Sequence, residues 1–97
     1  MKCFEMKPGL EMDIIVARDV LGWRYSTEEE YAHLRLSTTW DGMRKVIEQM
    51  QRKGKCLTII NNLYGTYDVK FSGQKVYTRL SDLPHAVCTA AILTLEV

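Results

Sequence analysis

The spacing of apolar residues changes at Gly54, and this change limits the possible folds more than any other feature of the sequence. Before Gly54, apolar residues recur at helical intervals, whereas residues 55–62 and 66–72 are rich in β-branched and aromatic types. Because only a few residues, among them turn formers, separate these two segments, we expect them to form an antiparallel hairpin. A third, shorter strand is predicted over 75–80.

Two amphipathic helices are predicted before the hairpin. Over 9–21, one apolar stripe alternates with charged positions that can face water, among them Asp13. Over 39–53, a second stripe follows Ser37 and Thr38, either of which can cap the helix. The stripes consist of Leu10, Ile14, Ala17 and Leu21 in the first helix and of Trp40, Met43, Val46, Ile47 and Met50 in the second.

The segment between these helices, 23–36, is predicted to be a loop. Ser26 and Glu29 fit a capping box, but no apolar face follows them, so at most a short helical turn is expected.

A last helix is predicted over 82–95, and apolar residues on most of its sides indicate that it is largely buried. His85 and Cys88 lie three positions apart on it, so they are either a reactive or metal-binding pair or two structural residues. Two ligands do not make a zinc site, and a cysteine among apolar residues is usually inert. We therefore interpret both as structural and expect no catalytic residue and no metal.

Composition indicates one soluble domain over residues 1–97. The net charge of +1 gives no general attraction to nucleic acid, so duplex nucleic acid is not an expected partner. The 3 cysteines are scattered, which favours a reducing, cytoplasmic setting, and no apolar run is long enough to cross a membrane. No phosphate-binding loop or other cofactor motif is present, so no cofactor is expected.

Four segments resemble, in the same order, the blocks of the phage ABA sandwich domain family. They are "EMDIIVARDVLGW" at 11–23, "STTWDGMRKVIEQM" at 37–50, "YDVKF" at 67–71 and "PHAVCTAAIL" at 84–93. The resemblance implies a small α+β protein of a bacteriophage or prophage, in which helices pack on a β-sheet in the manner of an α/β/α sandwich. It implies no enzymatic activity. With the elements above, the expected fold is about three helices on an antiparallel sheet of about three strands.

Two groups of basic and aromatic residues are candidates for ligand binding. Arg24 and Tyr25 follow the first helix, beside Trp23, which either fills the core or stacks on a ligand. In the sheet region, alternation along the strands predicts a shared face. This second group consists of Lys70, Lys75, Tyr77 and Arg79.

Three functions are consistent with these features. The first is a non-enzymatic phage protein that sequesters a small anionic, nucleotide-like immune signal at the interface of a homo-oligomer. The second is a protein-protein interaction module, acting on a host factor or in phage assembly, through an apolar patch around Trp23, Tyr31 and Trp40. An enzyme using His85 and Cys88 ranks last.

Overall fold

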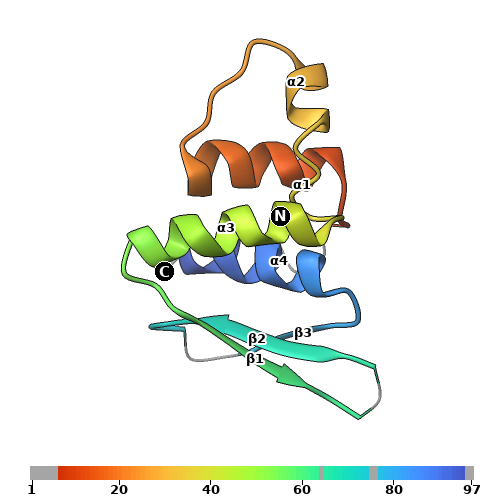
Figure 1. The fold of residues 1–97 in the computed structure, drawn as a ribbon, viewed down its shortest axis with the longest axis vertical. Coiled ribbons are helices and arrows are strands. Elements are labelled where there is room, and N and C mark those ends of the chain that lie inside the picture. The colour runs from red at the N-terminus through yellow and green to blue at the C-terminus, as the bar shows by residue number, and fades with distance from the viewer. Residues whose placement is uncertain (1–6, 64, 75–76, 96–97) are drawn as a thin grey trace.

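The computed structural model describes residues 7–63, 65–74 and 77–95 (Figure 1). The predicted site residue Lys75 lies outside these ranges, as do Cys3 and Tyr64. The elements in chain order are α1 Leu10–Ile15, the π-helix η2 Val16–Leu21, α2 Glu28–Ala32, α3 Trp40–Arg52, β1 Leu57–Asn61, β2 Tyr67–Phe71, β3 Thr78–Leu80 and α4 Leu83–Leu95. The predicted order of helices and strands is thus confirmed, with ends that differ by a few residues.

The three strands form one antiparallel sheet in the order β1-β2-β3. The helices lie on one side of this sheet (Figure 1). Helix α4 packs against β2 and β3, and α3 and η2 pack in turn on α4. The α+β class and the antiparallel sheet are confirmed. In the described chain, two layers of helices lie on one side of the sheet.

The core lies between the sheet and the helices. On β2, Val69 and Phe71 point toward the helices and are fully buried. On α4, Val87, Cys88 and Thr89 are equally buried, although consecutive residues point to different sides of a helix. The apolar character on most sides of α4 is therefore explained by its central position, with β2 on one side and α3 and η2 on others.

The predicted buried face of the first helix is partly wrong. Leu10 is 38% exposed, whereas Asp13, expected to face water, is only 3% exposed. The buried positions are Met12, Asp13, Val16, Ala17, Val20 and Leu21, which repeat every four residues. A repeat of four suits the wider turn of η2 better than the α-helical repeat from which the stripe was predicted.

The predicted helix caps are shifted by one or two residues. Thr27, rather than Ser26, caps α2 by accepting a hydrogen bond from Glu30 N, and Thr39 caps α3 by accepting one from Gly42 N. Ser37 instead binds the carboxylate of Asp13. The 5-residue α2 is the short helical segment that was expected within this loop.

Candidate functional site

Lys70, Tyr77 and Arg79 lie on the outer face of the sheet, the face turned away from the helices. Arg79 is opposite Asp68 in the register of β2 and β3, and Lys70 shares the face of Asp68. The Lys70 ammonium lies 4.9 Å from the centre of the Tyr77 ring. The predicted shared face therefore exists for the three members that the structure describes. We call Asp68, Lys70, Tyr77 and Arg79 the outer cluster.

The positive charge of Arg79 is already paired with a carboxylate of the outer cluster. Its Nε and Nη2 donate to the two carboxylate oxygens of Asp68 at 2.6 and 2.9 Å. These hydrogen bonds lower the pKa of Asp68 and raise that of Arg79. An anion that approached Arg79 would meet the carboxylate as well, so Lys70 is the better placed cation for an anionic ligand.

Arg24 and Tyr25 lie in a different part of the molecule. They follow η2 and precede α2, at the opposite end of the long axis from the sheet (Figure 1). Tyr25 is 39% exposed and packs edge-on against Tyr31, with ring centres 5.1 Å apart. One chain therefore cannot bring Arg24 and Lys70 to the same ligand.

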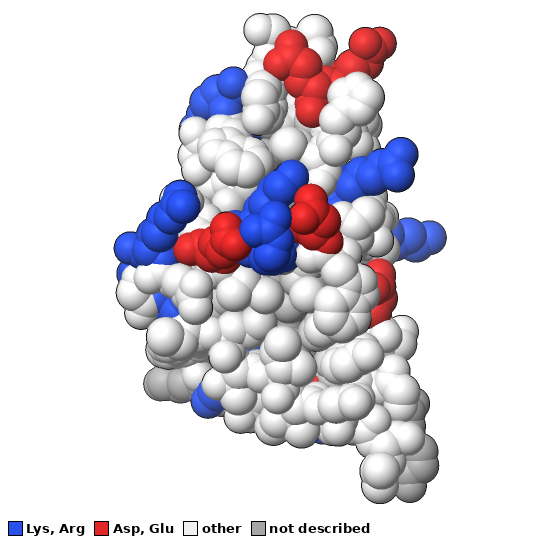
Figure 2. All heavy atoms as spheres, in the orientation of Figure 1, with Lys and Arg blue, Asp and Glu red and all other residues white. Residues whose placement is uncertain are grey.

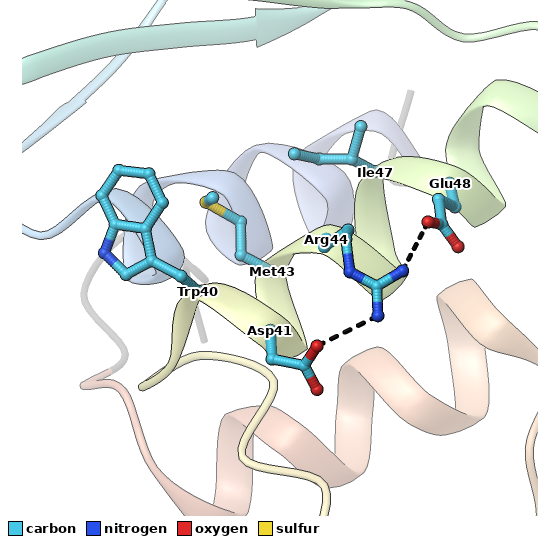
Figure 3. A pocket seen from close by; sticks show the side chains of 6 residues that line it. All are labelled: Trp40, Asp41, Met43, Arg44, Ile47 and Glu48. Carbon is cyan, nitrogen blue, oxygen red and sulfur yellow. Dashed lines mark hydrogen bonds and ion pairs between the residues drawn. The ribbon is translucent and has the colours of Figure 1, made fainter.

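A second candidate surface lies on α3, where Trp40 is exposed, Ile47 is partly buried and Met43 is buried. Trp40 is 62% exposed, and with Met43 and Ile47 it lines an open hollow that is mostly apolar. The three side chains project from the side of α3 that faces the strands (Figure 3). We call Trp40, Met43 and Ile47 the α3 surface.

Charged residues border the α3 surface and neutralise one another. Arg44 bonds to Asp41 at 3.0 Å and to Glu48 at 2.6 Å, and Lys45 lies 3.6 Å from Asp41. The bonds to Arg44 lower the pKa of Asp41. Figure 2 shows charged side chains across the middle of this face, with a broad uncharged area between them and the sheet end. The hollow is thus apolar within a charged border.

The sequence placed Trp40 in the core stripe of α3 and also in a patch with Trp23 and Tyr31. The patch is wrong: Tyr31 is buried, and Trp23 is partly buried against the core. Of the three residues, Trp40 alone lies mostly exposed. The helical spacing of Trp40, Met43 and Ile47 correctly predicted that they share one face of α3. It did not predict that Trp40 would be left exposed on this face.

Cys88 lacks the surroundings of a nucleophile. It is fully buried, and its Sγ donates to Leu36 O at 3.3 Å. Burial raises the pKa of the thiol, and the charges of Asp13 and Asp82 raise it further. The thiolate is therefore strongly disfavoured. Within the described ranges, no three His, Cys, Asp or Glu side chains come together to hold a metal ion. None of the described helices is long and apolar enough to span a bilayer.

Comparison with known proteins shows a similarity of fold alone. No protein-family model matches the sequence, and no curated protein matches it either. The fold resembles that of a phage protein. A crystal structure at 2.0 Å of a phage protein from Bacillus cereus ATCC 14579 superposes with a TM-score of 0.71 over 95% of this chain and 90% of that chain, at 16% sequence identity. The resemblance to the phage ABA sandwich family is not confirmed, since the similarity at this identity is one of fold.

Proposed function

We propose that this protein is a non-enzymatic accessory protein of a bacteriophage or prophage that binds another protein through the α3 surface in the host cytoplasm. The observation that carries the proposal is Trp40, a large apolar side chain that is 62% exposed beside an apolar hollow. The fold shared with a phage protein supports the phage origin.

The exposed indole of Trp40 costs free energy that a partner would recover by covering it. Burying apolar surface is worth roughly 25 cal/mol per Å², and tryptophan is among the residues that most often dominate binding energy. Met43 and Ile47 line the hollow one and two helical turns from Trp40, so an amphipathic helix laid along α3 could place apolar side chains there. The paired charges of Asp41, Arg44 and Glu48 would form the polar rim.

The test compares the protein with a Trp40→Ala variant in affinity capture from host-cell extract, followed by calorimetry with the purified partner. We expect a loss of affinity of roughly 30-fold or more with an unchanged melting temperature, because Trp40 is mostly exposed. Leu63→Ala, at a side chain that is 98% exposed beyond β1, is the matched control and should bind as the parent does. Equal affinity of the parent and Trp40→Ala would exclude the α3 surface.

A second candidate function is sequestration of a small anionic, nucleotide-like immune signal by the outer cluster. It is favoured by Lys70 beside the Tyr77 ring, which offers a cation and a stacking surface together. A shallow hollow next to Arg79, lined also by Asn61, Asn62, Leu63 and Thr66, adds amide and hydroxyl groups. The pairing of Arg79 with Asp68 makes this candidate the weaker one.

Calorimetry with cyclic di- and trinucleotides and ADP-ribose derivatives tests this second function. Lys70→Glu should abolish binding, whereas Arg18→Glu, a charge reversal at an exposed position of η2, should not. Recovery of the unaltered ligand after denaturation is the result expected of sequestration, and turnover would indicate an enzyme. The absence of binding by any of these compounds would leave the α3 surface as the functional one.

A further inference from the structure

The outer edge of β1 carries backbone groups that have no partner strand. Two hydrogen bonds fix the pairing pattern on its inner side: Ser72 N donates to Cys56 O at 2.9 Å, and Asn62 N donates to Thr66 O at 2.9 Å. Hydrogen-bonded and non-bonded pairs alternate along an antiparallel ladder, so these two bonds assign every position between them.

The residues of β1 between these bonds divide into two sets. Thr58 and Ile60 belong to the set that bonds inward to β2, because the register runs from 57 to 61 without a bulge. The N–H and C=O groups of Leu57, Ile59 and Asn61 therefore point away from β2. On that side the described ranges contain no further strand, since β1 is at the end of the sheet order.

This edge has none of the features with which proteins usually block strand pairing. Residues 56–63 contain no charged residue and no proline. Ile59 is 43% exposed on the helix side and Ile60 is 44% exposed on the outer side, so the strand presents apolar side chains on both faces. The opposite edge differs, because β3 has only 3 residues and carries Arg79. The β1 edge is thus the one suited to accept another strand.

We propose that β1 pairs antiparallel with β1 of a second copy about a two-fold axis beside Ile59. In this register Leu57 lies opposite Asn61 of the partner subunit, and Ile59 lies opposite Ile59 of the partner subunit. All three outward-facing residues then exchange backbone hydrogen bonds. Two three-stranded sheets become one continuous sheet of six strands.

A second copy fits this edge better than a charged foreign strand because the strand itself is neutral. Antiparallel self-pairing of 56–63 brings no like charges opposite one another, and a net charge of +1 per chain opposes association only weakly. The two-fold axis uses the same edge on both copies, so assembly stops at a dimer. It also places two outer clusters on one face, with their β2 strands roughly 14 Å apart from three strand spacings.

Residue-resolved amide hydrogen exchange tests the pairing directly. In a monomer the amides of Thr58 and Ile60 are bonded, whereas those of Leu57, Ile59 and Asn61 face water. In the dimer all five are bonded, so we expect the second set to exchange as slowly as the first. Rapid exchange of Leu57, Ile59 and Asn61 beside protected Thr58 and Ile60 would overturn the proposal.

Light scattering during size-exclusion chromatography provides the second measurement. The parent and Ile59→Val should have twice the monomer mass, and Ile59→Pro should be monomeric, because proline removes an N–H group that the monomer does not use. A parent protein with the mass of a monomer would refute the dimer, and so would an Ile59→Pro variant that remains dimeric. If Ile59→Pro fails to fold, hydrogen exchange in the parent still decides. Trp40→Ala should remain dimeric, so this proposal and the α3 surface can fail separately.

Discussion

Ser37 donates two hydrogen bonds to one carboxylate oxygen of Asp13, from its backbone N at 2.8 Å and from its Oγ at 2.6 Å. The Ser37 Oγ also accepts a hydrogen bond from Gly9 N at 2.8 Å. Both side chains are buried, so Ser37 fastens the start of α1 to the segment that leads into α3. A charged group inside the protein is tolerated here because its oxygen is bonded.

Replacing Ser37 with alanine should therefore destabilise the protein. The change removes the Oγ bond and leaves the Asp13 carboxylate with less compensation in a buried place, a loss of roughly 1.5–3 kcal/mol. Urea unfolding followed by circular dichroism measures this loss. Ser26→Ala, at an exposed serine, is the control and should unfold at the parent's urea midpoint. Coinciding curves for Ser37→Ala and the parent would contradict the role assigned to this serine.

Gly42 should not tolerate alanine, although it lies inside α3. A Cβ at this position would meet Arg35 O and would lie 2.6 Å from Leu36 Cα, both backbone atoms. The resulting overpacking is expected to cost roughly 1–3 kcal/mol and to outweigh the gain of about 1 kcal/mol in helix propensity. Gln51→Ala, on the exposed side of α3, should stay within about 0.5 kcal/mol of the parent. A Gly42→Ala variant more stable than the parent would show that the 35–36 backbone moves freely.

Truncation at Val87 or Ile47 should destabilise the fold by roughly 1–4 kcal/mol. Val87 is fully buried in α4, whereas Ile47 is only partly buried at the α3 surface, so its loss should fall near the lower end. Thermal unfolding of Val87→Ala, Ile47→Ala and the exposed Leu63→Ala gives the comparison. Should Val87→Ala melt with the parent, the central position of α4 would be wrong.

The pair of Asp68 and Arg79 should contribute to acid sensitivity. The hydrogen bond from Arg79 lowers the pKa of Asp68 in the folded protein below the usual value. A lowered folded-state pKa gives stability that is present above the unfolded pKa of about 3.9 and is lost as pH falls through the folded value. Denaturant unfolding between pH 7 and pH 2 should show a smaller acid loss in Arg79→Gln than in the parent. Parallel pH profiles would argue against this contribution.

Periodicity predicted the elements well because it reports on which side of each segment is buried. Residues 39–53 and 82–95 gave α3 and α4 almost at their observed ends, and the hairpin followed from the short link between β1 and β2. Asp13 was misplaced because its burial depends on Ser37, a partner distant in sequence. No local pattern records such a bond.

The candidate site was harder to predict than the fold. Alternation placed Lys70, Tyr77 and Arg79 on one face correctly, but the bond from Asp68 to Arg79 depends on a register that the sequence does not contain. Trp40 shows the converse problem. Its spacing fits a helix face, but its exposure depends on how α3 packs against the rest of the fold.

The difference in exposure between Cys88 and Cys56 allows the opening of the core to be measured in the protein itself. Cys88 is buried with a raised pKa, and Cys56 is exposed just before β1. In a Cys3→Ser background, a thiol reagent should therefore modify Cys56 at once and reach Cys88 only when α4 separates from its neighbours. The delay between the two reactions measures how often the core opens, and mass spectrometry can follow it.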